Sequence, residues 1–508
     1  MAELDGETAT HVAAHSGNAE LLLLLLAAAP STAAAVTEDE GRSPLHLAAR
    51  AGNEPAARVL LAAAPATAAA CDDEGCAPLA AAAQCGHVAI VRLLAAAAPA
   101  VAAVCSDEKF TPTHLAAQAG HAEVVKCLLA AAPATIRSCT DVGLLPLHLA
   151  AMVGECPVVS LLVEAAPDTA LAHSSRRNTA LHVAATAAQL GAVKLLAAAA
   201  PAALLVRGEG GCLPLHCAAQ AGCAESANAL LEAAGQQAAA CAAARSEAGM
   251  SPLHVACSRG HAPVVSLLLE HAPPTAQQAG NNGSRPIHAA AERGSVEVLR
   301  LLLAAFVEEA AAADSGLCTP LMLAARSGHV DAMHVLLEAL PDPVAAIQAV
   351  SNTGYTAIHH AAAGGHTAAV QLLLACAGPG IATAVVTNTA STPLHLAAAG
   401  CHLSTVQALL PGLTWPCVSG RLCWPTAPAW PARCLLLSTV RPSRRRTWWH
   451  GCRWPTPSGC ARLRWRCTAP RRDAASTCPG SCCGGCWRAL TAELAGLPLQ
   501  CASPSPCM

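Results

Sequence analysis

A short string of residues recurs along this 508-residue chain at an almost constant interval. It reads Ser-Pro-Leu-His-Leu-Ala-Ala at residues 43–49 and Thr-Pro-Leu-His-Leu-Ala-Ala at residues 392–398. The position of its histidine is found twelve times, most often 34 residues apart: His11, His46, Ala80, His114, His148, His182, His216, His254, His288, Met322, His359 and His395. So regular a period predicts a fold that grows by repeating one unit, since a single core rarely accommodates so long a chain.

Each unit predicts two short helices followed by a turn. Ser or Thr before Pro suits a helix start, because the hydroxyl caps free N–H groups and Pro tolerates the first turn. A glycine six residues after the histidine position, such as Gly120, predicts the end of that helix in a left-handed conformation. A second helix follows with an apolar stripe, as in residues 124–129, until Ala-Ala-Pro breaks it, as at Pro133. A polar turn such as residues 72–75 leads back, and neighbouring units must stack to bury their stripes.

The pattern Thr-Pro-Leu-His-x-Ala-Ala, then Gly-His, then Val-x-x-Leu-Leu, resembles the ankyrin repeat over roughly residues 3–411. The resemblance implies an all-α repeat solenoid of stacked helix-turn-helix units with short finger turns. The tetratricopeptide repeat has a similar length, but it needs Trp, Tyr and Phe at fixed places, and this region contains no Trp. We therefore predict an ankyrin-repeat array at residues 1–411.

The motif histidines invite a metal-binding or catalytic interpretation, but a metal site needs several ligands at one point, whereas these recur once in each unit. The resemblance implies instead that each histidine hydrogen-bonds neighbouring backbone and fixes the finger. Some units depart from the pattern. Ala80 and Met322 replace the histidine, Ala188 replaces the turn glycine, and Cys401 stands where the last turn glycine is expected. We expect the extra residues around 236–245 to form a loop.

Residues 412–508 form a chemically different segment. They carry 13 Arg and two acids, a net charge of +11, while the rest carries 17 bases and 31 acids, a net charge of −14. All eight Trp and 12 of the 27 Cys also lie there, without helical or strand periodicity, so we expect disorder. Three interpretations remain. The first is a metal-binding module built on Cys478, Cys482, Cys483 and Cys486. The second is a basic arm for nucleic acid or acidic membranes, built on residues 444–446, and the third is a sequence outside the natural reading frame. We favour the third.

Several functional classes lack support in the sequence. The chain shows no glycine-rich phosphate loop, no Gly-x-Ser-x-Gly elbow and no His-Glu-x-x-His motif. We therefore predict a protein that is not an enzyme and has no catalytic residue, cofactor, metal or small-molecule substrate. The acidic start at residues 1–7 is unlike a signal peptide, and no apolar run reaches the about 20 residues of a transmembrane helix. We expect a soluble protein of the cytoplasm or nucleus, with reduced cysteines that mostly serve packing, such as Cys85, Cys127 and Cys217.

The finger tips should carry binding specificity, because they vary between units while the rest is committed to packing. We expect them to line a concave surface with the first helices. The first tips are acidic, the middle tips are basic and the later tips are polar, the last of them at Asn388. Phe110 and Tyr355 either anchor a partner or pack on their fingers. The predicted partner-binding residues are Glu38, Asp39, Glu40, Asp72, Asp73, Glu74, Asp107, Glu108, Phe110, Arg176, Arg177, Arg207, Asn281, Asn282, Arg285, Asn352 and Tyr355.

These observations predict a non-catalytic scaffold or adaptor for another protein, with the acidic tips steering a partner that carries a basic patch. An alternative is the regulatory ankyrin portion of a larger protein of the channel, kinase or ubiquitin-ligase type, whose C-terminal part is missing. A weaker alternative is nucleic-acid binding through the basic tail.

Overall fold

A computed structural model describes residues 7–383 and 391–412 of the chain. The tail at 413–508 lies outside the described residues, together with the predictions of disorder, metal binding and nucleic-acid binding that fall on it. Asn388, the last predicted finger tip, also lies outside them.

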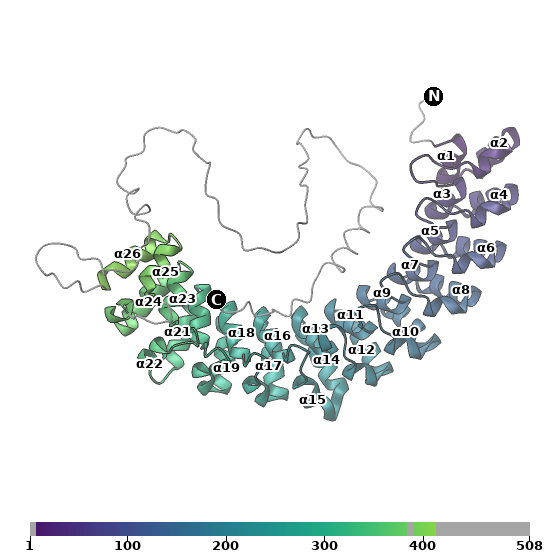
Figure 1. Ribbon diagram of the computed structural model, residues 1–508. Coiled ribbons are helices and arrows are strands. Elements are labelled where there is room, and N and C mark those ends of the chain that lie inside the picture. Colours follow the sequence, from purple (N-terminus) through teal and green to yellow (C-terminus); the bar gives the residue numbers. More distant parts are fainter. Residues whose placement is uncertain (1–6, 384–390, 413–508) are drawn as a thin grey trace, which may run out of the picture. The chain divides into compact units, whose positions relative to one another are not determined.

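The described residues form twelve helix pairs and contain no strand (Figure 1). The first helices of the pairs are α1 (Ala9–Ser16), α3 (Pro44–Ala51), α5 (Pro78–Cys85), α7 (Pro112–Gln118), α9 (Pro146–Val153), α11 (Ala180–Thr186), α13 (Pro214–Ala221), α16 (Pro252–Arg259), α18 (Pro286–Arg293), α20 (Pro320–Ser327), α23 (Ala357–Ala363) and α25 (Pro393–Ala399). The second helices are α2 (Ala19–Ala28), α4 (Glu54–Ala63), α6 (Val88–Ala97), α8 (Ala122–Ala131), α10 (Cys156–Ala165), α12 (Leu190–Ala199), α14 (Ala224–Ala234), α17 (Ala262–His271), α19 (Val296–Ala305), α21 (Val330–Ala339), α24 (Thr367–Ala377) and α26 (Leu403–Leu409). This arrangement confirms the predicted all-α repeat solenoid.

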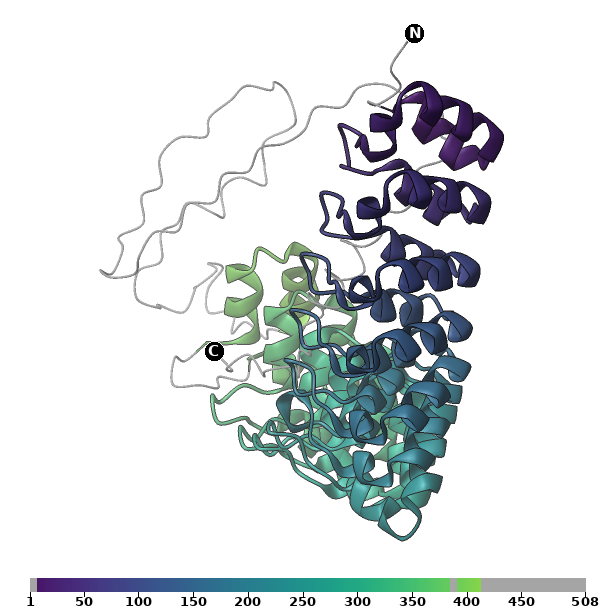
Figure 2. The ribbon, with the colours of Figure 1, turned by 90° about the vertical axis from the view of Figure 1, so that its right-hand side faces the viewer.

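Each pair packs against the next, and the core is the series of interfaces between them. First helices contact first helices, as α1 contacts α3, and second helices contact second helices, as α2 contacts α4. Leu45 and Leu60 are fully buried in these interfaces, and so is Ala48, whose small side chain allows the helices to approach closely. For the first units, Figure 2 shows the fingers on one side of the first helices and the second helices on the other. The fingers and first helices thus form one face of the stack.

The prolines that we predicted as helix breakers also begin a short 3-10 helix, which the sequence did not lead us to expect. In the second unit, α4 ends before Ala64, and η2 runs over Pro65–Ala69. The Thr67 hydroxyl donates to the Ala64 carbonyl oxygen at 2.6 Å and so closes this turn. Equivalent turns follow most second helices: η1 (Pro30–Ala34), η3 (Pro99–Ala103), η4 (Pro133–Arg137), η5 (Pro167–Leu171), η6 (Pro201–Leu205), η9 (Pro273–Gln277), η10 (Val307–Ala311) and η11 (Pro379–Thr383).

The longer units carry extra helices. The expected loop around 236–245 is wrong in part, because η8 (Gly235–Gln237) and α15 (Ala238–Ala242) occupy most of it. The insert is rich in alanine, which favours helix, and Cys241 and Ala242 are buried against the array. The unit that precedes α23 gains α22 (Pro343–Gln348). Two further 3-10 turns are η7 (Glu209–Gly211) in a finger and η12 (Leu410–Gly412).

The turn glycine between the two helices serves two purposes. Gly52 has φ +80°, a backbone conformation that side chains with a Cβ rarely adopt. A Cβ added there would also lie 2.6 Å from the ring of His87 in the next unit. His87 is placed there by a hydrogen bond from its Nε2 to the carbonyl oxygen of Arg50, at 3.1 Å. The histidine of the Gly-His motif therefore reaches back across the interface to the preceding unit, a contact that the sequence did not predict.

Cysteine burial is mixed. Cys217 and Cys257 are buried, and burial raises the pKa of the Cys217 thiol to about 11. Cys85, which we predicted to pack, is exposed, and Cys127 is half-buried. The packing prediction therefore holds for Cys217 and is wrong for Cys85.

No helix within the described ranges is both long and apolar enough to cross a membrane.

Candidate functional site

In eight of the twelve described units, the motif histidine joins the start of the first helix to the following finger. In the second unit, His46 Nδ1 accepts a hydrogen bond from the Ser43 backbone N–H at 3.1 Å, and His46 Nε2 donates to the Cys76 carbonyl oxygen at 3.0 Å. Equivalent bonds of 3.0–3.1 Å start from Nε2 of His11, His114, His148, His182, His216, His254 and His288. These bonds agree with the finger-fixing role that the family resemblance implies.

The same geometry fixes the protonation state of these rings. Nδ1 accepts and Nε2 donates, so each ring is neutral with its proton on Nε2. Burial lowers the pKa of five of them to about 4: His114, His148, His182, His216 and His254. Among the described residues, no group of three or more His, Cys, Asp or Glu side chains is placed to hold a metal ion. The histidines are committed to the fold.

Main-chain hydrogen bonds connect most fingers to the next. The backbone N–H of Asp73 donates to the Glu40 carbonyl oxygen at 3.1 Å, that of Asp107 to Glu74 at 3.1 Å, and that of Asp141 to Glu108 at 3.2 Å. The series continues later in the chain, for example from Ser315 to Asn282 at 3.1 Å. The tips are therefore held at a fixed spacing before any partner arrives.

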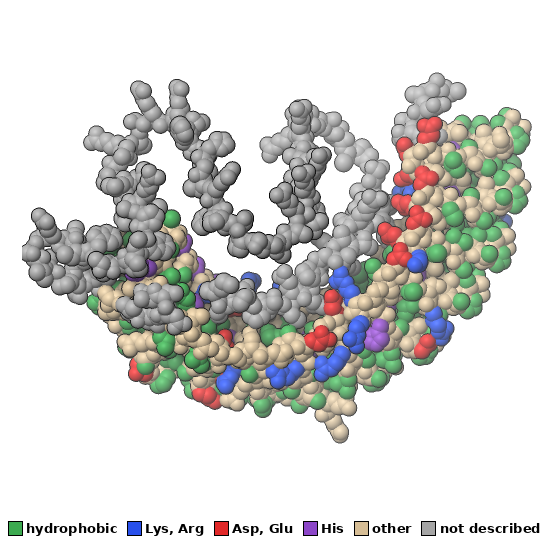
Figure 3. All heavy atoms as spheres, in the orientation of Figure 1, with side chains coloured by type: hydrophobic (Ala, Val, Ile, Leu, Met, Phe, Trp, Pro, Cys, Tyr) green, Lys and Arg blue, Asp and Glu red, His purple; other side chains and the backbone are tan. Residues whose placement is uncertain are grey.

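Acidic side chains crowd the first four fingers. Those at the tips are exposed, and we call this set the acidic strip: Glu38, Asp39, Glu40, Asp73, Glu74, Asp107, Glu108 and Asp141. Figure 3 shows acidic side chains along the fingers beside α1 to α7. With Asp72, the four fingers carry nine acids against two bases, Arg42 and Lys109, a net charge of −7.

The members of these fingers differ in what they do. Asp72, a predicted binding residue, is half-buried and closes its own turn, because its Oδ1 accepts from the backbone N–H of Glu74 at 3.1 Å and of Cys76 at 2.8 Å. Within the described residues, the side chains of Asp73 and Glu74 form no hydrogen bond or ion pair, so they remain available to a partner. Sequence reasoning missed Asp141, although it lies 34 residues after Asp107; it is exposed and pairs with Lys109 at 2.8 Å.

The middle tips are basic, but their cations are partly occupied. Arg207 Nη1 donates to the carbonyl oxygens of Gly211 at 3.1 Å and Arg245 at 2.6 Å, which ties two fingers together. Arg176 is half-buried and lies 3.9 Å from Glu209. Arg177 is exposed at a backbone φ of +63°.

The later tips use their amides to connect fingers. Asn281 donates from Nδ2 to the Glu247 carbonyl oxygen at 2.8 Å, and Asn352 donates to that of Ser315 at 2.9 Å. Asn282 Oδ1 accepts from the Ser284 backbone N–H at 3.1 Å. These three amides thus stabilise the fingers on which we predicted them.

Three of the predicted partner-binding residues lie at finger bases, which is where the sequence already places Phe110 and Tyr355, each directly before a threonine. Arg285 directly precedes α18, and its Nη1 pairs at 2.6 Å with the buried carboxylate of Glu309, whose side chain is 2% exposed. Phe110 is buried, with its ring edge-on to His114 at a centroid distance of 5.9 Å. Tyr355 is half-buried and lies 5.7 Å from His359. Packing on the finger, one of our two alternatives for the aromatics, is what this geometry favours.

The comparison with known families agrees with this geometry. The family model described as ankyrin repeats (3 copies) matches residues 1–68, 64–139, 113–207, 147–241, 237–308, 274–347 and 321–414. The chain belongs to the ankyrin-repeat family. Ankyrin repeats are generally protein–protein interaction modules and are typically not catalytic. A search of curated proteins gave no match. In this ankyrin array the acidic strip is exposed and sets the first four fingers apart from the later ones, which makes it the candidate binding site.

Proposed function

We propose that the chain is a non-catalytic scaffold or adaptor, which binds another protein on the face formed by its fingers and first helices. Within that face, the acidic strip receives a basic segment of the partner. The observation that carries this proposal is that the side chains of Asp73 and Glu74 are exposed and take no part in the bonds that hold their finger, which their main chain makes. The motif histidines are occupied in the finger network, which supports a non-catalytic role.

The electrostatics support a basic partner. Nine acids against two bases on four adjoining fingers produce a local negative field, which raises the rate of encounter with a positive surface and favours one orientation. The finger-to-finger hydrogen bonds order the tips in advance, so binding there costs little conformational entropy. Because the strip is exposed, its attraction should weaken as salt is added.

Ankyrin-repeat proteins are commonly intracellular, and we propose that this scaffold works in the cytoplasm or nucleus.

Charge reversal on one finger tests the proposal. Asp73→Lys with Glu74→Lys changes the charge of the strip but leaves the turn-closing Asp72 in place. The matched control is Glu164→Lys with Glu338→Lys, which changes the charge equally at exposed positions in the last turns of α10 and α21. Both variants should keep the helical circular dichroism of the wild type.

Crosslinking and mass spectrometry with the intact chain would identify a partner, and its affinity would then be measured with purified protein at low and high salt. We expect the finger variant to bind roughly tenfold more weakly at low salt and to depend less on salt, while the control binds as the wild type does. If the folded finger variant keeps full affinity, or if the partner crosslinks only to second helices, the acidic strip is not the binding site.

A further inference from the structure

The second helix of the first repeat is apolar on every side. α2 contains six consecutive leucines at residues 21–26, and its only charged residue is Glu20. Leu22 and Leu26 are buried against the array, yet Leu21, Leu23 and Leu24 are 42%, 57% and 71% exposed. A helix that is apolar all round is normally covered on all sides. Part of α2 therefore presents a surface that the array itself does not use.

The exposure of Leu21 and Leu24 follows from their place in the stack. Leu21 is the third residue of α2, and the third residue of every other second helix among the described repeats is buried, as Ile90 and Val124 are at 1% and 0% exposure. A preceding repeat covers that position elsewhere, whereas Leu21 and Leu24 belong to the first repeat that the structure describes.

Leu23 cannot be explained by stacking. It is the fifth residue of its helix, and in the other eleven described second helices this position is polar: Arg58, Arg92, Lys126, Ser160, Lys194, Asn228, Ser266, Arg300, His334, Gln371 and Gln407. The position is exposed or half-buried in those repeats, so its leucine in α2 points to an apolar contact outside the stack.

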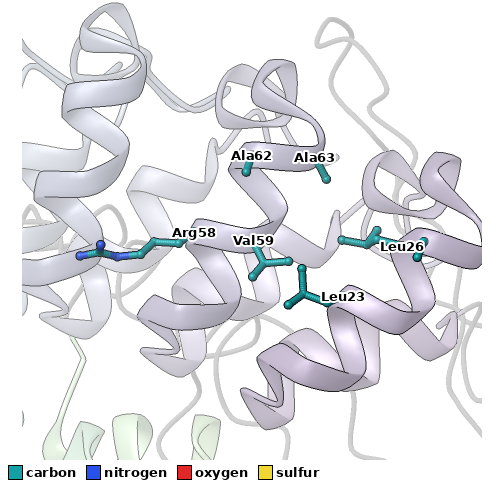
Figure 4. A pocket seen from close by; sticks show the side chains of 7 residues that line it. Leu23, Leu26, Arg58, Val59, Ala62 and Ala63 are labelled. Carbon is teal, nitrogen blue, oxygen red and sulfur yellow. The ribbon is translucent and has the colours of Figure 1, made fainter.

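A groove lies directly beside Leu23. It is a shallow depression of about 520 Å³, open to solvent, between α2 and α4, and it is lined by Leu23, Leu26, Ala27, Arg58, Val59, Ala62 and Ala63. Figure 4 shows Leu23 and Val59 close together between the two helices, with the Arg58 guanidinium directed away from them. Figure 3 shows hydrophobic side chains over this end of the array. One small patch thus combines protruding leucines with an apolar hollow.

We propose that a second copy of this chain docks here, with α2 of each copy packed antiparallel on α2 of the other. A two-fold interface must be self-complementary, and this patch has both the protrusions and the hollow that self-complementarity needs. Antiparallel packing separates the two Glu20 carboxylates to opposite ends of the contact, and Ala27 and Ala28 let the helices approach closely. Second helices already pack side by side within the array, as α2 does on α4, although there they run in the same direction.

The contact is one helix wide, so the dimer is weak and depends on concentration. It joins two acidic strips in one particle, which would let the scaffold bind a partner with two basic segments by avidity. The proposal does not rest on the acidic strip, because the two surfaces share no residue.

Sedimentation velocity of the full chain across the micromolar range tests the proposal. We expect a reversible monomer–dimer equilibrium for the wild type, and Leu23→Arg should weaken it roughly tenfold or more. Arginine occupies the same position in α4 and α6, so this variant should fold. The matched control is Leu205→Arg, which changes a leucine that is 45% exposed in η6, and its dimerisation should equal that of the wild type.

A photo-crosslinking amino acid in place of Leu24 adds a second measurement. It should form crosslinks to α2 or α4 of another copy in the wild-type background and lose them in Leu23→Arg. A chain that stays monomeric throughout, or a dimer that Leu23→Arg leaves unchanged, would overturn the proposal. Crosslinks to α25 and α26, which indicate end-to-end stacking, or only to a different protein or to lipid, would overturn it as well.

Discussion

One departure from the repeat pattern predicts a measurable coupling between two residues in adjacent repeats. Ala188 takes the place of a turn glycine and has φ +57°, which costs a residue with a Cβ about 1–2 kcal/mol. At the other turns, a Cβ would lie 2.6 Å from the ring of His87 or 2.5 Å from that of His261. The residue in the corresponding place after Ala188 is Cys223, not histidine. We infer that the smaller Cys223 compensates for the extra Cβ.

The magnitudes follow from this geometry. Ala188→Gly removes the backbone strain but makes the unfolded chain more flexible, so we expect a gain of about 0.5–1 kcal/mol in the free energy of unfolding. Cys223→His alone forces a ring against the Ala188 Cβ and should cost about 1–3 kcal/mol. In the double variant the clash is absent, and the new ring can donate to the Thr186 carbonyl oxygen as His87 does to Arg50, a gain of about 1 kcal/mol. The coupling free energy should therefore be about 2–4 kcal/mol.

Urea unfolding of the wild type, both single variants and the double variant measures this coupling. Long arrays need not unfold in one step, so amide hydrogen exchange of α11 to α14 should accompany it. Gly86→Ala is a reverse control, because it creates the same clash with His121 and should destabilise that repeat. Effects that add within about 0.5 kcal/mol would refute the compensation.

Three further predictions concern the buried polar groups. Lowering the pH from 7 to 5 should lower the urea midpoint, because unfolded histidines have a pKa near 6.5 and take up protons that the folded rings, with a pKa of about 4, do not. The stability that each buried ring contributes is complete above pH 6.5 and falls by up to about 1.4 kcal/mol per pH unit towards pH 4. A constant midpoint would contradict this. Ala80→His should raise the free energy of unfolding by about 1 kcal/mol, because it restores the hydrogen bond to the next finger. His114→Ala should lower the free energy of unfolding by about 2–3 kcal/mol, because it removes that bond. Urea titrations measure both changes, and two neutral variants would contradict the prediction. Arg285→Ala should lower the free energy of unfolding by about 3 kcal/mol, because it leaves the buried Glu309 carboxylate without its partner. Arg285→Thr combined with Glu309→Thr should recover most of this loss in thermal unfolding. An equal loss in both variants would contradict the ion-pair explanation.

The sequence predicted the features that local chemistry decides. The spacing of proline, histidine and glycine gives the helix pairs, because caps and left-handed glycines act within a few residues. It did not predict η2, since a proline that ends one helix can also begin the next turn. It did not separate Asp72 from Asp73, because only the folded turn shows which carboxylate accepts the backbone N–H groups. Arg285 was misplaced for a similar reason, as its partner Glu309 lies 24 residues away.

The regular interior of the array provides a way to separate structural residues from binding residues. Twelve copies of one unit define what each position needs for packing, so a residue that breaks the pattern requires an explanation. Some breaks have a partner inside the array, as Arg285 has in Glu309. Others, such as Leu23 in α2 and Glu74 in the acidic strip, are exposed and serve no packing contact that the repeat requires. Because stacking explains the first kind and not the second, the exposed breaks are where binding to other molecules should be sought.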